Sequence, residues 1–227
     1  MDIIQSNLLS SINGIVHGFS DKALGGDSER IARALNLSGL NLLKQVHGAR
    51  VLIVSEITPG GERGEADAQV TDLRGIGLGV ATADCVPILL ASEDARVVSA
   101  VHAGWRGTLG AIAANAVRVI RESYGIEPGS LRAAIGPSIG KCCYEVGAEV
   151  GSEFREKYEN TGEYLSEAGD GKYMLDLTLA NEILLRSEGV SEVEALELCT
   201  KCSPEFYSYR GDGKGTGRQL SVIGISR

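Results

Sequence analysis

The middle of the chain alternates short apolar runs with polar turns and then changes to a longer amphipathic segment. Apolar runs over 76–82, 86–91 and 96–101 are separated by turn residues such as Ser92-Glu93-Asp94, a pattern typical of buried β-strands. From 107 to 124 the apolar residues instead recur with the period of a helix. This region therefore predicts three strands followed by a helix that Gly125 ends.

The rest of the chain continues to alternate strand-like and helix-like patterns. Strands are predicted over 131–135, 193–198 and 219–225, and helices over 28–37, 146–158 and 177–188. Such alternation is typical of a mixed α/β fold. The glycine-rich segment 211–217 lacks the spacing of a phosphate-binding loop and predicts a tight hairpin instead.

Length and composition indicate one globular domain covering residues 1–227. Hydrophobic residues make up 43% and charged residues 23% of the 227 positions, values typical of globular chains, and no apolar run approaches the ~20 residues of a membrane span. The first residues lack the pattern of a secretory signal, so we expect a cytoplasmic protein without a membrane partner. The net charge of -8 argues against nucleic acid as a partner.

The chain has five cysteines, an odd number that suits reduced thiols better than a disulfide framework. Cys199 and Cys202 have the spacing of half a zinc knuckle, but no second pair with this spacing exists. Cys142 and Cys143 are adjacent, a spacing that seldom lets both sulfurs reach one ion. We therefore expect these four residues to be free structural thiols.

Three short stretches carry the candidate chemistry: KQVHG, ADCVP and VHAGWRG, which contain His47, Cys85 and His102. One thiolate and two imidazoles form the three-ligand shell that zinc uses when its fourth position stays open for water or substrate. The same donors suit copper, so they do not name the metal. Each histidine also has an ordinary interpretation, as an imidazole satisfied by hydrogen bonds.

Two neighbours strengthen the metal interpretation, and one alternative competes with it. Asp84 precedes Cys85 and is suited to orient a ligand, while the indole of Trp105 is suited to wall a flat aromatic substrate. Alternatively, Cys85 with either histidine forms a nucleophilic pair of the papain kind. A thiolate bound to zinc is a blunted nucleophile, so metal content decides between the two hypotheses.

The motifs KQVHG, TADCVPILL, VHAGWRG, AIGPSIGKCCYEVG, FYSYR and GRQLSVIGI occur in this order, from about residue 16 to residue 225. Together they resemble the bacterial purine nucleoside phosphorylase family once named polyphenol oxidases of laccase type. Members of that family are also described as peptidoglycan editing factors. The resemblance implies a layered α/β/β/α sandwich with mixed sheets and zinc held by His47, Cys85 and His102.

The resemblance further implies two reactions on purine nucleosides. One is phosphorolysis of adenosine, inosine, guanosine and methylthioadenosine, and the other is hydrolytic deamination of adenosine. Cys85, His102 and Asp84 are then the candidate catalytic residues. Nucleoside and phosphate have five candidate contacts: Gln45, Trp105, Arg106, Arg210 and Lys22.

One region departs from the family pattern. Family members carry FSTRxGG followed by a long segment, whereas here Lys22 takes the place of the arginine and the chain runs almost directly into the helix predicted from residue 28. A lysine holds phosphate as a point charge, without the two-pronged geometry of arginine.

Two other function classes stay open at this point. One is a cysteine amidohydrolase that edits peptidoglycan precursors, with Cys85 as nucleophile and His102 as base. The other is a non-catalytic protein in which the metal only braces the fold. The copper oxidase that the old family name suggests needs a trinuclear cluster and a further Cys/His copper, which three histidines cannot supply. We expect a monomer or a homodimer.

Overall fold

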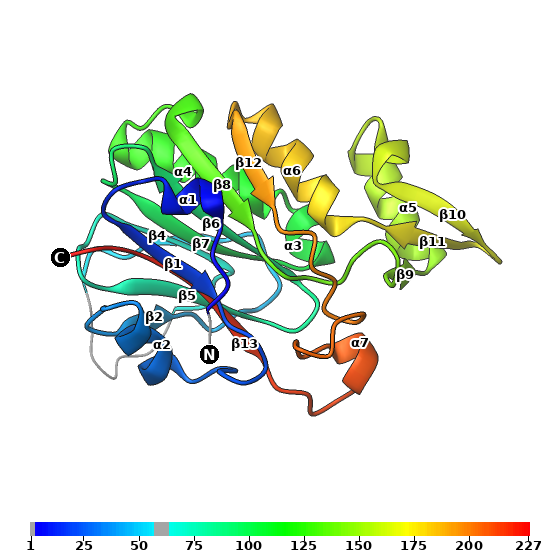
Figure 1. The fold of residues 1–227 in the computed structure, drawn as a ribbon. Helices are drawn as coiled ribbons and strands as arrows, with labels where there is room; N and C mark the ends of the chain where they lie inside the picture. Colours follow the sequence, from blue (N-terminus) through cyan, green and yellow to red (C-terminus); the bar gives the residue numbers. More distant parts are fainter. Residues whose placement is uncertain (1–2, 57–63) are drawn as a thin grey trace.

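Two β-sheets stacked face to face form the centre of the molecule in the computed structural model, which describes residues 3–56 and 64–227 (Figure 1). The first sheet has the order β1 (Ile15–Phe19), β13 (Gln219–Ile225), β5 (Gly77–Thr82) and β2 (Leu40–Leu42). The second has the order β12 (Glu192–Ala195), β8 (Leu131–Ile135), β6 (Val86–Ser92), β7 (Val98–Ala103), β4 (Ala68–Thr71) and β3 (Val51–Ile53). Both contain parallel and antiparallel pairs.

Alternating side chains along the central strands explain why the sheets stack. Leu89 of β6 packs in the core between the sheets, together with Leu78 of β5 and Ile223 of β13. The neighbouring residues Ile88 and Leu90 belong to the other core, under the helices. Successive side chains point to opposite faces of a strand. The unbroken apolar run in β6 therefore packs into both hydrophobic cores, one on each face of the second sheet.

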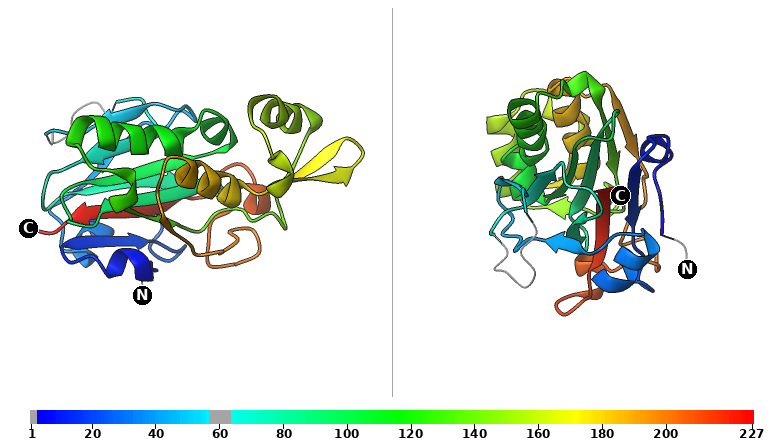
Figure 2. Two further views of the ribbon diagram at one scale, coloured as in Figure 1. Left: turned by 90° about the horizontal axis from the view of Figure 1, so that it is seen from above. Right: turned by 90° about the vertical axis from the view of Figure 1, so that its left-hand side faces the viewer.

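Helices cover the outer faces of both sheets. α4 (Ile112–Tyr124) and α6 (Leu177–Ser187) lie over the second sheet, and α2 (Ser28–Ala34) packs on the first sheet through Ile31 and Val222. The side view in Figure 2 shows the resulting order of helix, sheet, sheet and helix. This arrangement confirms the predicted mixed α/β class and its α/β/β/α layering.

A smaller sheet extends from one end of the sandwich (Figure 1). It has the order β10 (Leu165–Gly169), β11 (Lys172–Leu175) and β9 (Glu145–Val146), and α5 (Ala148–Lys157) packs against it. These strands are short and partly exposed, so they carry no apolar run that sequence patterns recognise. The remaining elements are α1 (Asn7–Ser10), α3 (Trp105–Leu109), α7 (Tyr209–Asp212) and the short turns η1 (Pro128–Ser130) and η2 (Thr161–Glu163).

Two predicted elements differ in kind from the structure, and others, such as α2 and β12, differ only in their bounds. The helix predicted over 107–124 is two helices, α3 and α4, because Ala111 adopts a left-handed conformation with φ of 59° between them. The hairpin predicted over 211–217 is wrong, since α7 occupies its start and Gly213 and Gly215, both with positive φ, lead into β13.

The predicted domain 1–227 includes residues 1–2 and 57–63, which lie outside the described residues. Within the remainder of the chain, no helix has both the length and the apolar character needed to cross a membrane.

Candidate metal centre and substrate pocket

Strand pairing in the second sheet brings two of the predicted ligands together. Cys85 directly precedes β6 and His102 lies near the end of β7, and the antiparallel pairing of these strands sets Pro87 opposite His102. His47 arrives from the segment between β2 and β3. The ligand atoms of His47, Cys85 and His102 all lie within 4.8 Å of one another.

The space around these donors fits a metal ion. The rings of His47 and His102 meet edge to face with centroids 4.9 Å apart. A Cβ atom on Gly104 would lie 3.1 Å from the Cys85 sulfur and 3.2 Å from Cδ2 of His47, so glycine is what lets the donors converge. One thiolate and two imidazoles are the donors of an open zinc site, and they also suit copper.

A carboxylate that the sequence analysis missed holds two of the three donors. Asp67 is fully buried and its Oδ1 lies 2.8 Å from Nδ1 of His102, which leaves Nε2 of that ring for a metal. The same carboxylate accepts hydrogen bonds from the backbone N–H groups of Val46, His47 and Gly48. These bonds hold His47 in a left-handed conformation with φ of 58°.

Without a metal, the buried donors form a charged pair. Burial alone would raise the pKa of Cys85, but hydrogen bonds from His102 and His47 and their charges lower it to about 6. Burial alone would lower the pKa of His102, but its contacts with Asp67 and Cys85 raise it to about 9. Near neutral pH the site therefore holds a thiolate beside an imidazolium.

A pocket of about 580 Å³ opens onto the three donors. Aromatic rings of Trp105, Tyr144 and Tyr209 contribute to its walls. Three arginines also line it: Arg106, Arg210 and Arg218. The guanidinium of Arg106 lies 4.2 Å from the centroid of the Trp105 ring. Flat apolar surface, cations and metal donors thus meet in a single cavity.

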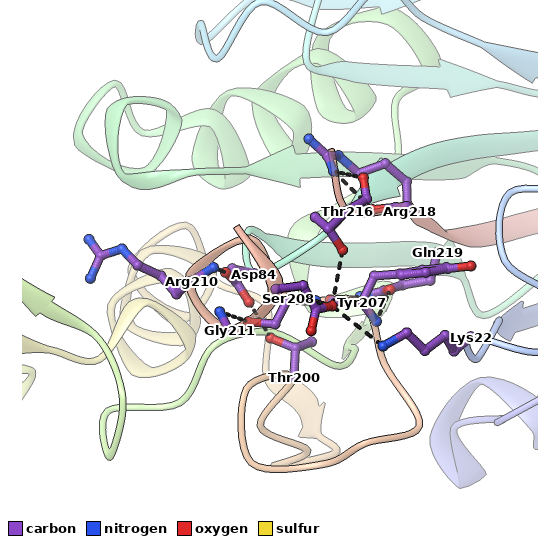
Figure 3. A network of polar contacts seen from close by, with 12 residues as sticks. Lys22, Asp84, Thr200, Tyr207, Ser208, Arg210, Gly211, Thr216, Arg218 and Gln219 are labelled. Carbon is purple, nitrogen blue, oxygen red and sulfur yellow. Dashed lines mark hydrogen bonds and ion pairs between the residues drawn. The ribbon is translucent and has the colours of Figure 1, made fainter. Parts of the chain in front are cut away.

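Asp84 lies in the pocket wall but is engaged by the segment 200–210 (Figure 3). Its Oδ1 accepts a hydrogen bond of 2.7 Å from the Thr200 hydroxyl, and its Oδ2 accepts one of 2.7 Å from the backbone N–H of Arg210. The carboxylate that contacts the imidazole of a predicted ligand is that of Asp67 instead. Asp84, whose φ is 90°, positions the segment that carries Arg210.

Gln45 lines the pocket, but its side-chain amide is hydrogen-bonded to the backbone of Ala81. Its side chain donates to the carbonyl of Ala81 and accepts from the N–H of Ala81, both at 2.8 Å, so it braces the loop before His47 against β5.

Lys22 is not among the residues that line the pocket. Its ammonium lies 3.4 Å from Asp212 and 5.2 Å from the ring centroid of Tyr207, and Figure 3 shows it on the far side of Asp84 from the Arg210 guanidinium. Lys22 is thus an ion-pair partner of Asp212 in the structure, and its contact with phosphate stays a prediction from the family pattern.

The other four cysteines also converge. The sulfurs of Cys142, Cys143, Cys199 and Cys202 all lie within 4.8 Å of one another, and none forms a disulfide. These cysteines are free thiols, as expected from the sequence, but the sulfurs of the adjacent Cys142 and Cys143 both lie close to the other two, which the spacing along the chain did not predict. The fold, and not the spacing along the chain, brings Cys142 and Cys143 to the pair formed by Cys199 and Cys202.

Comparisons with known proteins identify relatives of this chain. A family model described as multi-copper polyphenol oxidoreductase laccase matches residues 10–226. The purine nucleoside phosphorylase of Deinococcus radiodurans is 42% identical over 202 residues, which cover 87% of this chain and 76% of the relative. Adenosine deaminase RL5, from an unknown prokaryotic organism, is 36% identical over 200 residues, covering 83% and 76%. The crystal structure of YlmD from Geobacillus stearothermophilus superposes with a TM-score of 0.89 at 30% identity and 99% coverage of both chains.

Proposed function

The chain belongs to the multi-copper polyphenol oxidoreductase laccase family, and on this premise we propose that it is a zinc-dependent enzyme acting on purine nucleosides. The observation that carries the proposal is the single pocket that combines a Cys/His donor set, aromatic walls and three arginines. Relatives named purine nucleoside phosphorylase and adenosine deaminase support it. The proposed reactions are phosphorolysis of adenosine, inosine, guanosine and methylthioadenosine and hydrolytic deamination of adenosine.

In this proposal His47, Cys85 and His102 hold the metal, and Asp67 orients His102 and the turn that carries His47. The chemistry that zinc supplies when bound in such a three-ligand site is the activation of water at neutral pH. Copper is the alternative metal, because the donor set accepts it too.

Binding of the nucleoside uses the flat walls of the pocket. The purine ring stacks on Trp105, whose other neighbour is the Arg106 guanidinium. Tyr144, whose pKa burial raises to about 12, is a neutral phenol near neutral pH, and the exposed Tyr209 also lines the pocket. These aromatic side chains take no part in the reaction. They hold the nucleoside so that its reacting carbon lies near His47, Cys85 and His102.

Phosphorolysis requires a phosphate ion held beside the sugar. As a phosphate oxygen bonds to C1′, the bond from C1′ to the purine nitrogen breaks, so one nucleoside and one phosphate yield a free base and ribose 1-phosphate. Arg106, Arg210 and Arg218 are the pocket cations that offset the charge of the phosphate and orient it. Arg210 is held for this role by its backbone contact with Asp84 and by its side-chain hydrogen bond of 2.8 Å to the carbonyl of Glu145.

Deamination uses water in place of phosphate. Water adds at C6 of adenine and ammonia leaves, which converts adenosine into inosine. Asp67 holds the His102 ring through its Nδ1, so that Nε2 faces the proposed metal position during this reaction.

The test is product analysis by chromatography with zinc-loaded protein. Adenosine with phosphate should yield adenine and ribose 1-phosphate, and adenosine without phosphate should yield inosine. Cys85→Ala should lose about one zinc per chain and both activities. If wild-type protein yields neither product over a panel that includes inosine, guanosine and methylthioadenosine, the nucleoside proposal is wrong.

A cysteine hydrolase of peptidoglycan precursors is the second candidate, because the metal-free site holds a thiolate beside an imidazolium. Full activity on a muropeptide amide after metal removal would favour it. If metal is bound but both nucleosides and muropeptides are left unchanged, the non-catalytic role is favoured.

We propose that the protein acts in the cytoplasm as a monomer or a homodimer, with nucleosides and phosphate as its partners. Light scattering after size-exclusion chromatography measures the oligomeric state.

A further inference from the structure

Four cysteines outside the pocket form a compact cluster of sulfur atoms. The sulfurs of Cys142 and Cys143 lie 3.7 Å apart, those of Cys142 and Cys202 3.7 Å apart, and those of Cys143 and Cys202 3.4 Å apart. Cys199 completes the group, with its sulfur within 4.8 Å of the other three. A zinc ion with four sulfurs at about 2.3 Å sets them about 3.8 Å apart, so the cluster already has nearly this size.

Two tight turns present the cysteines in pairs. In the first turn the N–H groups of Cys143 and Tyr144 both donate to the carbonyl of Gly140, and in the second the N–H of Ser203 donates to the carbonyl of Cys199. A parallel bridge between Ser138 and Cys199 joins the two segments. The backbone therefore fixes the positions of both pairs independently of any bond between sulfurs.

Gly140 is required where the two turns meet. A Cβ atom there would lie 3.3 Å from the Cys142 sulfur, 3.3 Å from the Cys199 Cβ and 3.5 Å from the Cys199 sulfur. The N–H of Gly140 donates to the Cys199 sulfur at 3.3 Å. Backbone donors of this kind stabilise a thiolate, which is the form that binds metal.

We propose that Cys142, Cys143, Cys199 and Cys202 bind a second zinc ion in a closed site that has a structural role. Four thiolates are the donor set of structural zinc, and they leave no open position for substrate. Soft thiolates also disfavour magnesium, calcium and manganese. The bound site has a net charge of about -2, and the exposed Lys141 and Lys201 each adjoin one of its cysteines.

The site would fasten two segments that wall the substrate pocket. Cys143 directly precedes Tyr144, and Thr200 lies between two of the ligands and donates to Asp84. The zinc thus links the β8 to β9 connection with the segment leading to α7. It braces the pocket without touching substrate.

Metal analysis of the protein purified under reducing conditions, without added metal, tests the proposal. Wild type should contain about two zinc ions per chain, and the double variant Cys142→Ser/Cys202→Ser about one. Cys85→Ala should lose the other ion and keep this one, so failure of either site is seen separately. Lys201→Ala, a change in the same turn that removes no sulfur, should retain both ions.

Zinc X-ray absorption on the wild-type protein gives a second measurement that does not depend on the variants folding. One Cys/His site and one four-sulfur site together predict about 2.5 sulfur ligands per zinc. Amide hydrogen exchange should also accelerate in segments 138–144 and 198–212 when the double variant loses its ion. About one zinc per chain in wild type, with these four thiols reacting freely or joined as disulfides, would overturn the proposal, as would iron in place of zinc.

Discussion

At the residue scale, one buried carboxylate organises the candidate metal centre. Asp67 pairs with His102 and also accepts three backbone hydrogen bonds from the turn that carries His47. Burial would raise the pKa of Asp67, but the contacts with His102 and with these N–H groups lower it, so it stays ionised at neutral pH. A single side chain therefore fixes the relative position of two donors from distant parts of the chain.

Asp67→Asn should weaken zinc binding at the Cys/His site by about 10- to 100-fold. An amide presents an N–H either to Nδ1 of His102 or to the backbone of 46–48, so one of the two sets of hydrogen bonds is lost. Chelator competition measures the affinity. The matched control is Asp94→Asn, a change in a turn of the same hydrogen-bonding type between β6 and β7, which should leave the affinity unchanged. Equal affinity in Asp67→Asn and wild type would contradict the positioning role.

The pKa values of the donors predict how zinc affinity depends on pH. In the metal-free protein His102 keeps a proton up to about pH 9 and Cys85 is a thiolate down to about pH 6. Zinc must displace the His102 proton below pH 9 and, in addition, the Cys85 proton below pH 6. The affinity should therefore fall by about tenfold per pH unit between these values and more steeply below.

Titrations of Cys142→Ser/Cys202→Ser protein at a series of pH values measure this dependence at the first site alone. An affinity that does not change from pH 9 to pH 6 would show that His102 is neutral in the metal-free protein.

At the scale of elements, the segment from Cys199 to α7 is held to the sandwich by hydrogen bonds and an ion pair at several points along its length. Asp84, at the start of the second sheet's central hairpin, accepts hydrogen bonds from the side chain of Thr200 and the backbone of Arg210. Lys22 pairs with Asp212 at the other end of α7 (Figure 3). The position of Arg210 in the pocket depends on these contacts, since α7 itself is only one turn long.

Thr200→Val should lower the free energy of unfolding by about 1 to 3 kcal/mol, because it leaves one oxygen of the buried Asp84 carboxylate without its donor. The phosphate KM should rise more than kcat falls, as Arg210 loses its fixed position, while zinc at His47, Cys85 and His102 is retained. Urea unfolding and steady-state kinetics measure the two effects.

Thr216→Val is the matched control. It removes an exposed hydroxyl contact to Asp212 and should change stability by no more than about 0.5 kcal/mol. If both threonine variants behave alike, the contact with Asp84 does not hold the segment.

At the scale of the whole molecule, the two sheets share one apolar layer that supports the candidate metal centre. β5, β6 and β7 carry Leu78, Leu89 and Ala100 into this layer, and β6 and β7 also deliver Cys85 and His102 at their ends. The donors are thus mounted on the most buried strands, which keeps their separation constant.

Leu89→Ala should lower the free energy of unfolding by about 2 to 5 kcal/mol, because the fully buried side chain leaves a cavity between the sheets. Chemical denaturation gives the value. Ile53→Ala, on the edge strand β3 where the side chain is 48% exposed, should cost no more than about 0.5 kcal/mol. A loss below 1 kcal/mol for Leu89→Ala would mean that the sheets do not pack as described.

The local pattern of apolar and polar residues was sufficient to predict the central strands and helices. The runs that became β5, β6, β8 and β13 are continuous apolar segments, and the period of α6 matches one buried face, so each element is determined by its own residues. The Cys/His donor set was likewise visible, because its residue types are rare in this chain. The sequence did not predict the end of the helix at Ala111 or the irregular segment after α7. Whether a residue adopts a left-handed backbone conformation depends on the packing around it.

Which residues meet was decided by the tertiary structure alone. His17 shows this, because it is a buried acceptor for the N–H of Ser6 with a pKa lowered by burial to about 4, although the sequence presents it as a histidine like the other two. Asp67 joins His102 across 35 positions, and Cys142 approaches Cys202 across 60. Contacts over such separations follow from strand pairing and turn geometry, which no local pattern of hydrophobic and polar residues encodes.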